Sequence, residues 1–374
     1  MTSNEAAWLT GPHPPLKVGP APYTEPGAGE ILIRNHAVAV NPVDWFKPYI
    51  GDRMFSWIKY PFVLGSDLAG EVVAVGSGVT DMKAGDRVLA MAAGPCQSRN
   101  RAAEGAFQRY TITLPRLTAV IPDFVSYEQA AVIPLGITTA ACGLYQKDLL
   151  ALALPTDNTT PRDQWLIVWG GATSVGCNAI QLGKASGYKV MTTSSPKNFT
   201  YVKSLGADIA LDYNSKTVAS DIVAALQGKE VVGALAIGAG STEALLGILA
   251  KCRGRKFIAS CSAAVALDKI ATGDRINLAA FLRILPAVLR ATIAVRTKSR
   301  WFGVREKFFD ASSVVDNEVG PAIYRDYLGK ALAAGTFRPA PPAKVVGNSL
   351  QDIEKAFAIQ RQGVSASKIV VRLG

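Results

Sequence analysis

Residues 165–176 read Trp165-Leu166-Ile167-Val168-Trp169-Gly170-Gly171-Ala172-Thr173-Ser174-Val175-Gly176, and this stretch decides the fold. It begins as an apolar run of β-forming residues and ends in a turn of small residues. A helical pattern follows through Lys184, and a second apolar run over 188–191 leads into Thr192-Thr193-Ser194-Ser195. A strand, a glycine turn, a helix and a parallel strand form the first βαβ unit of a dinucleotide-binding domain.

The turn differs from G-x-G-x-x-G at one position. Gly171 and Gly176 fit the first and third glycines, whereas Thr173 stands at the second. In such a turn, backbone N–H groups and the helix N-terminus face the cofactor pyrophosphate. We therefore expect the cofactor contacts to include the whole turn, with the Thr173 hydroxyl donating to the phosphate: Gly171, Ala172, Thr173, Ser174, Val175 and Gly176.

The residues after the second strand indicate which dinucleotide binds. A carboxylate there would hold the adenosine ribose diol and select NAD. The sequence has no Asp or Glu from Gly170 to Ala207, and the expected position reads Ser194-Ser195-Pro196-Lys197. Hydroxyls and a cation suit a 2′-phosphate, so the sequence predicts NADPH.

The composition limits the class of protein. The chain of 374 residues is long enough for two domains with sizeable cores, and its residues are 49% hydrophobic and 18% charged. We see no apolar run long enough for a membrane span and no secretory signal at the start. The five cysteines show no C-x-x-C spacing, so we expect free thiols and a cytoplasmic location.

The net charge of +11 is concentrated near the C-terminal third. Seven cations between Arg283 and Lys307 face only Glu306. A solvated helical face explains such a run most simply, and an acidic protein partner or an anionic substrate is the second explanation. No nucleic-acid recognition motif accompanies the charge, so we expect no nucleic-acid binding.

The rest of the chain divides around the dinucleotide stretch. Many short β runs with regular turns precede it and indicate a small β-barrel, with a turn over 41–45 and a helix beginning at Pro134. Further β-like runs follow over 208–213, 231–237 and 256–260, with helical patterns between them. This alternation predicts a doubly wound parallel sheet, and 366–373 reads as one more strand.

Several motifs resemble the medium-chain dehydrogenase/reductase superfamily over nearly the whole chain. They are Asn41-Pro42-Val43-Asp44-Trp45, Leu64-Gly65-Ser66-Asp67-Leu68-Ala69-Gly70-Glu71-Val72, Ala84-Gly85-Asp86-Arg87-Val88, Gly136-Ile137-Thr138-Thr139-Ala140, the glycine turn and Ser204-Leu205-Gly206-Ala207-Asp208. The chain is most similar to the zinc-free quinone oxidoreductase and enoyl reductase branch, including fungal trans-acting enoyl reductases of secondary metabolism. This resemblance implies a GroES-like β-barrel catalytic domain (1–140 plus 340–374) and a Rossmann NADPH-binding domain (141–339).

The sequence also indicates whether a zinc site is present. Zinc alcohol dehydrogenases carry an early Cys, a Gly-His-Glu motif and a four-Cys lobe. Here the Gly-His-Glu position reads Gly65-Ser66-Asp67, the early Cys region reads Asn41-Pro42-Val43-Asp44, and nothing resembles the lobe. Since a zinc site needs three or four ligands, we expect no metal.

The resemblance implies an activity and its residues. We expect NADPH-dependent hydride transfer to the activated C=C bond of an enone, enoyl thioester or quinone. The nicotinamide end is expected at Asn41, Pro42, Val43, Asp44 and Thr139. Catalytic candidates are Thr139, Tyr49 and Lys47, although Lys47 comes one residue later than the Lys of related reductases. Substrate-lining candidates are Trp45, Phe46, Gly136, Thr138, Trp301 and Phe302.

The adenosine end and the remaining strand ends complete the expected site. Around the 2′-phosphate we expect Ser194, Ser195, Lys197, Asn198 and Tyr213. Other cofactor contacts are expected at Ile237, Gly238, Ser260, Cys261, Ile369 and Val370. Cys261 has no base partner in the sequence, so we interpret its thiol as packing.

The segment 265–309 is long for a connection between strands. We expect a compact wall or lid over the substrate cleft, with a basic face open to an acyl carrier protein or polyketide synthase. Two other functions remain open, namely a redox-neutral cyclase or isomerase and a low-turnover NADPH-binding partner of a polyketide synthase. Either a monomer or a homodimer is compatible with the sequence.

Overall fold

The computed structural model describes residues 3–13, 15–156, 159–262 and 278–374. These residues form two compact units, the first up to Thr138 and again from Ser312, the second from Thr139 to Ala311. The sequence placed 312–339 in the cofactor-binding domain, but this segment packs with the first unit. Its buried Tyr324 explains why, because the phenol donates to the Pro134 carbonyl (2.8 Å) and bonds to Thr138 Oγ1 (2.7 Å).

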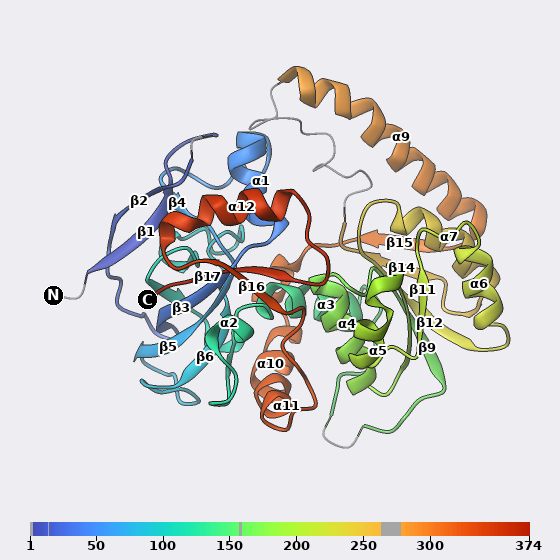
Figure 1. The fold of residues 1–374 in the computed structure, drawn as a ribbon, viewed down its shortest axis with the longest axis horizontal. Coiled ribbons are helices and arrows are strands. Elements are labelled where there is room, and N and C mark those ends of the chain that lie inside the picture. Colours follow the sequence, from blue (N-terminus) through green and yellow to red (C-terminus); the bar gives the residue numbers. More distant parts are fainter. Residues whose placement is uncertain (1–2, 14, 157–158, 263–277) are drawn as a thin grey trace. The chain divides into compact units, whose positions relative to one another are not determined.

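The first unit is built on mostly antiparallel sheets (Figure 1). The larger sheet has the order β16 (Ala343–Gly347), β17 (Lys368–Arg372), β3 (Ile31–Ala39), β5 (Asp67–Val75), β6 (Arg87–Met91), β8 (Thr118–Val120), with β7 (Tyr110–Thr113) on β3. The smaller has the order β2 (Lys17–Ala21), β1 (Asn4–Leu9), β4 (Phe62–Val63). Apolar side chains of β3 and β5, such as Ile33 and Leu68, are fully buried between them and the neighbouring elements.

The helices of the first unit are short. They are α1 (Pro42–Ile50), α2 (Tyr127–Ala130), α10 (Val319–Ile323), α11 (Gly329–Ala333) and α12 (Ile353–Arg361), with a π-helical turn over Tyr324–Leu328. The prediction of a turn over 41–45 is wrong, because Pro42 begins helix α1. Asn41 is the N-cap, Pro42 occupies the first helical position, and the Asp44 carboxylate accepts the Asn41 backbone N–H (2.7 Å).

The second unit is a parallel sheet with helices on both faces. Its strand order is β11 (Ile209–Asp212), β10 (Lys189–Ser194), β9 (Gln164–Trp169), β12 (Glu230–Ala236), β14 (Phe257–Ser260), β15 (Arg305–Phe308), with β13 (Arg253–Gly254) on β12. Helices α4 (Ser174–Ala185) and α5 (Phe199–Ser204) cover one face (Figure 1). The other face carries α6 (Val218–Ala225), α7 (Ser241–Lys251) and α9 (Leu278–Phe302). The predicted doubly wound sheet is thus confirmed.

The strand order fixes where a ligand can bind. From β9 the chain winds outward through β10 and β11, then returns to β12 on the other side of β9. Ligands of such sheets bind at the carboxyl ends of the strands where the order reverses. Here that edge is marked by Trp169, Thr193, Ala236 and Ser260, which the register aligns.

A compact wall was predicted for the long segment after β14, and only its part from Leu278 onward lies within the described residues. Its described part is the 25-residue helix α9 followed directly by the edge strand β15, and residues 263–277 lie outside the described chain. Helix α3 (Pro134–Tyr145) is the element that begins in the first unit and ends in the second. None of the described helices is both long enough and apolar enough to cross a lipid bilayer.

Candidate cofactor and active site

The glycine turn connects β9 to α4 at the carboxyl edge of the sheet. A Cβ on Gly171 would lie 2.1 Å from Thr192 Oγ1, and a Cβ on Gly176 would lie 2.2 Å from the Gly170 carbonyl oxygen. Both positions therefore require glycine, because a side chain at Gly171 would collide with β10 and one at Gly176 would collide with the backbone of the turn itself. The tight turn leaves the backbone N–H groups of Ser174 and Val175, the first two residues of α4, for an anion, which fits a dinucleotide pyrophosphate.

Thr173 has a different role from the predicted one. Its hydroxyl accepts the Gly176 N–H (3.0 Å) and donates to the Gly170 carbonyl (2.7 Å), so it caps α4. Because the Thr173 hydroxyl proton is already donated to the Gly170 carbonyl, the predicted donation of this proton to a phosphate is wrong. The neighbouring Ser174 hydroxyl oxygen is shielded and has no hydrogen-bond partner among the described residues, which is the kind of orphaned group that a bound phosphate satisfies.

The ends of β10 and β11 bring the predicted 2′-phosphate residues together. The Ser195 and Tyr213 hydroxyls are 3.1 Å apart, and Lys197 is exposed on the short helical turn Pro196–Asn198. Ser194, in contrast, is buried, and its hydroxyl donates to the Ser195 carbonyl (3.3 Å). Asp212 lies opposite Ser194, but its carboxylate accepts two hydrogen bonds from Asn214. This edge thus presents hydroxyls and an ammonium group.

The ends of β12 and β14 lie on the other side of the turn. The Gly238 N–H donates to Ser262 Oγ (2.7 Å), and Thr242 Oγ1 donates to Ser260 Oγ (2.9 Å). Burial raises the pKa of the Cys261 thiol to about 12, so this thiol stays protonated and unreactive near neutral pH. Ile237, Gly238, Ser260 and Cys261 therefore line the same sheet edge as the glycine turn.

In the first unit, two of the predicted nicotinamide-end residues, Asn41 and Asp44, belong to a buried polar network. Lys368 Nζ lies 2.8 Å from Asp67 Oδ2 and also donates to Asn41 Oδ1. Asn41 Nδ2 donates to Asp67 Oδ2 (2.8 Å) and lies 3.3 Å from Asp44 Oδ2. The backbone N–H of Leu135, at the start of α3, donates to Asp67 Oδ1 (2.6 Å). These contacts join α1, β5, α3 and β17 through side chains that are at most 5% exposed.

In this network, the predicted cofactor residues Asn41 and Asp44 have a structural role, and Asp67 and Lys368 are two members that the sequence did not predict. The side chains of Asn41 and Asp44 are committed to the protein interior, whereas the sequence predicted cofactor contacts for them. The pKa of the Asp44 carboxyl is raised to about 7, mainly by burial and also by the neighbouring Asp67, against the hydrogen bonds from Asn41 and the charge of Lys368. Sequence reasoning missed Lys368, although a single Lys before the apolar run Ile369-Val370-Val371 was a usable signal.

The same network occupies the position of the zinc motif. Asp67, from Gly65-Ser66-Asp67, is bound by an ammonium group and two N–H donors. Across 3–13, 15–156, 159–262 and 278–374, no three His, Cys, Asp or Glu side chains are grouped so that they could hold a metal ion.

Helix α1 carries the other residues that were predicted for the reacting end. Lys47 is buried, and its ammonium lies 2.9 Å from Asp52, which also accepts from the Tyr60 hydroxyl (2.7 Å). These hydrogen bonds, first that of Tyr60 and then that of Lys47, lower the pKa of Asp52 and keep it charged. Tyr49 is buried beside Trp45, with the Arg361 guanidinium 4.1 Å from its ring centre. Trp45 is also buried and donates to Gln360 Oε1, whereas Pro42, Val43 and Phe46 remain partly or fully exposed.

The start of α3 is largely interior. Thr138 is fully buried and its hydroxyl is bonded to Tyr324, so its side chain serves packing between α3 and the π-helical turn. Gly136 is buried as well, whereas Thr139 is half-buried. Ile369 and Val370 are fully buried in β17, between β16 and β3.

Trp301 and Phe302 are placed far from the glycine turn within the second unit. They end α9 just before β15 begins at Arg305, and Arg305 pairs with Phe257 at the start of β14. They therefore lie at the amino edge of the parallel sheet, opposite the carboxyl edge that carries the glycine turn. Their predicted role in lining the substrate site is wrong.

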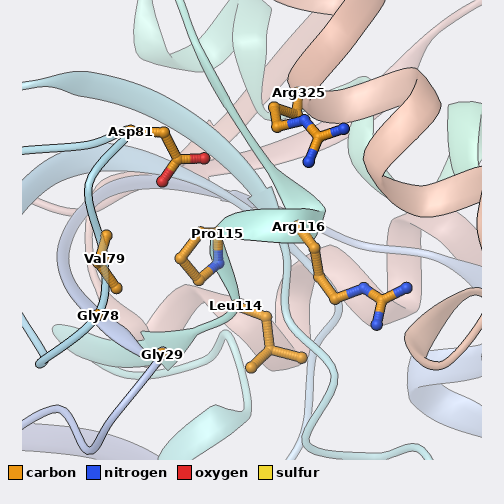
Figure 2. Close-up of a pocket in the computed structure, with 8 residues that line it drawn as sticks. All are labelled: Gly29, Gly78, Val79, Asp81, Leu114, Pro115, Arg116 and Arg325. Atoms are coloured by element: carbon orange, nitrogen blue, oxygen red, sulfur yellow. The ribbon is translucent and has the colours of Figure 1, made fainter.

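A separate pocket of about 240 Å³ lies on the first unit (Figure 2) and contains none of the predicted site residues. It is lined by Gly29, Gly78, Val79, Asp81, Leu114, Pro115, Arg116 and Arg325. The Arg325 guanidinium pairs with Asp326 (2.7 and 2.9 Å), and that of Arg116 donates to the Asn317 carbonyl and points away from Asp81. Each guanidinium thus has a partner within the protein, although Arg116 Nε has no hydrogen-bond partner among the described residues.

Comparison with known proteins agrees with this architecture. Residues 27–123 match the alcohol dehydrogenase GroES-like domain. The chain is 48% identical to "Dehydrogenase pigH" of Monascus ruber over all of both chains, and 34% identical to "Trans-enoyl reductase himH" of Aspergillus japonicus over 99% of this chain and 97% of that one. The crystal structure of CurK enoyl reductase has the same fold, with a TM-score of 0.72 and 20% identity over 99% of each chain. The chain thus belongs to the medium-chain dehydrogenase/reductase superfamily of nicotinamide-dependent oxidoreductases, among relatives that include fungal dehydrogenases and trans-enoyl reductases.

Proposed function

We propose that this protein is an NADPH-dependent reductase of secondary metabolism that adds hydride to an activated C=C bond without a metal. The observation that carries the choice of NADPH is the Ser195 and Tyr213 hydroxyl pair beside Lys197, at the strand end where a carboxylate would select NAD. The choice of a C=C substrate is supported by relatives whose names describe enoyl reductases.

Bound NADPH would supply the hydride, and the protein would supply binding and orientation. The backbone of 171–176 and the start of α4 would hold the pyrophosphate. Ser195, Lys197 and Tyr213 would hold the 2′-phosphate through charge-assisted hydrogen bonds, with Asn198 at the same turn. Ile237, Gly238 and Ser260 would line the cofactor along the carboxyl edge of the sheet.

At the reacting end, the chain must bind the carbonyl oxygen that gains negative charge in the transition state. The half-buried Thr139 hydroxyl is our candidate donor, because a preorganised donor there stabilises the developing enolate. Lys47 is the second candidate, since Asp52 keeps its ammonium group fixed. Phe46 and Gly136 are the remaining candidates for the substrate wall. The α-carbon then takes a proton from water or from a nearby side chain such as Tyr49.

The test is a substrate panel followed by NADPH oxidation at 340 nm. We would compare an enone, an enoyl thioester, a quinone and a simple aldehyde, each with and without a chelator. Turnover of at least one of the first three, no turnover of the aldehyde and insensitivity to chelator are the expected results. Aldehyde turnover that is lost on chelation would overturn the proposal. Product formed without NADPH would instead support a cyclase or isomerase.

A further inference from the structure

Two other elements of the first unit hold the first turn of helix α3. The Leu135 N–H of this turn donates to Asp67 Oδ1 on β5 (2.6 Å). The Pro134 carbonyl accepts from the Tyr324 hydroxyl (2.8 Å), which is also bonded to Thr138 Oγ1 (2.7 Å). An N–H, a carbonyl and a side chain of one helical turn are thus bound by residues that are far away in the sequence.

The hydrogen bonds of Tyr324 have a fixed direction. A phenol carries one proton, and Tyr324 donates this proton to the Pro134 carbonyl. The phenol oxygen therefore accepts the hydroxyl proton of Thr138. Thr138 and Tyr324 are 0% and 1% exposed, so solvent does not compete for either hydroxyl. Loss of the phenol hydroxyl would leave the buried Thr138 hydroxyl without this acceptor, which is costly in a protein interior.

The backbone that carries Tyr324 is irregular. Tyr324 begins the π-helical turn Tyr324–Leu328, which lies between α10 and α11. Single π-helical turns are rare and frequently occur at functional sites. An uninterrupted α-helix over 319–333 would present residue 324 in a different direction relative to α11, because side-chain directions follow the helical period. The irregular turn thus coincides with the residue that binds α3.

The next residue along α3 is the candidate donor of the reaction. Thr139 follows Thr138 directly and lies one helical turn after Leu135. Side chains have fixed angular positions on a helix, so the orientation of the first turn determines where the Thr139 hydroxyl points. A donor stabilises an enolate oxygen at about 2.7–3.1 Å, and an error of about 1 Å in position can cost roughly a hundredfold in rate.

We propose that Tyr324 is a positioning residue, whose hydroxyl fixes the first turn of α3 together with the Asp67 carboxylate and so fixes the direction of the Thr139 hydroxyl. This inference rests on the role proposed above for Thr139. Because Tyr324 is buried, it acts through α3 and not by contact with the substrate. A role in packing alone would instead change stability without any link to the Thr139 hydroxyl.

A double-mutant cycle tests whether Tyr324 acts through Thr139. The variants are Tyr324→Phe, which removes only the hydroxyl, Thr139→Val, and the two combined. The control is Tyr327→Phe, because Tyr327 belongs to the same π-helical turn and its ring packs on Phe337. We would measure kcat and KM with the best substrate of the panel, at a temperature at which calorimetry shows every variant to be folded.

We expect Tyr324→Phe to lower kcat roughly tenfold, because the turn keeps its hydrogen bond to Asp67 but loses the one to the phenol. The KM for NADPH should stay unchanged, since the glycine turn belongs to the second unit. In the Thr139→Val background, Tyr324→Phe should lower kcat no further. Independent, multiplicative decreases would overturn the proposal, and so would a wild-type kcat in Tyr324→Phe or an equal decrease in Tyr327→Phe.

Two results separate this inference from the proposed function. A wild-type kcat in Thr139→Val would refute the role of Thr139 and this inference with it, whereas a decrease without coupling to Tyr324 would overturn this inference alone. Hydrogen exchange of the backbone amides of 135–139 needs no turnover, so it tests the anchoring of α3 even if no substrate is reduced. These amides should exchange faster in Tyr324→Phe than in the wild type and Tyr327→Phe, and unchanged exchange would overturn the proposal.

Discussion

Replacing Lys368 with Met should destabilise the first unit strongly, because it breaks the buried ion pair with Asp67. The side chains of Asp67 and Lys368 are 0% and 5% exposed, and their charged atoms are 2.8 Å apart. Without the ammonium group, the Asp67 carboxylate keeps only the hydrogen bonds from Asn41 and the Leu135 N–H. Asn41 Oδ1 also loses the Lys368 hydrogen bond.

The expected loss can be estimated from these contacts. Removing one partner of a buried ion pair costs about 3–5 kcal/mol of unfolding free energy. Two N–H donors still stabilise the carboxylate, so we expect the lower end, about 3 kcal/mol. For a unit of this size, roughly 2–4 °C in Tm corresponds to each kcal/mol, which gives a decrease of about 6–12 °C. Helix α3 and β17 should loosen together, because Asp67 joins them.

The assay is urea unfolding and calorimetry of the whole chain, with Lys344→Met as the matched control. Lys344 is an exposed lysine on the adjacent strand β16, opposite Ile369, and its loss should cost less than about 0.5 kcal/mol. The double variant Asp67→Leu/Lys368→Met removes both charges and should be no less stable than Lys368→Met alone. A loss below about 1 kcal/mol for Lys368→Met would refute the reasoning, and so would additive losses in the double variant.

Three further outcomes are expected. Because burial raises the folded-state pKa of Asp44 to about 7 from 3.8, its contribution to stability is fully present below about pH 4 and is lost as the pH rises through 7. Urea unfolding of Asp44→Asn should lack this decline, and an unchanged pH profile would argue against a buried carboxyl. Gly176→Ala should weaken NADPH binding at least about tenfold, because its Cβ would meet the Gly170 carbonyl. Fluorescence titration measures this affinity, and an unchanged value would contradict pyrophosphate binding at the glycine turn. Trp301→Ala should leave turnover of a free enone unchanged, and a large fall in kcat/KM would return this residue to the substrate site.

The parallel sheet could be predicted because its signals are local. The strand, the glycine turn and the helix from Trp165 to Lys184 follow one another without interruption, so the βαβ unit is visible in one stretch. The hydroxyls of Ser195 and Tyr213 also follow from strand ends that parallel pairing brings to one edge. Helix α1 was missed although Asn41, Pro42 and Asp44 have the spacing of an N-cap, a first turn and a capping carboxylate.

The remaining differences depend on tertiary contacts. Asp67 and Lys368 are distant in the sequence, and only the pairing of β17 with β3 and of β3 with β5 brings them together. Trp301 was misplaced because β15 was not recognised. A helix that connects parallel strands must return the chain to the amino edge, so residues just before a strand cannot lie at the cofactor edge.

The most direct test of the central claim follows the hydride itself. NADPH carrying deuterium at the transferable C4 position would be incubated with the protein and the best substrate of the panel, and the product analysed by mass spectrometry and NMR. The proposed function predicts one deuterium at the β-carbon of a saturated product and, with NADH in place of NADPH, a much slower reaction. A product of unchanged oxidation level without deuterium would contradict a reductase, and equal use of NADH would contradict the role given to Ser195, Lys197 and Tyr213.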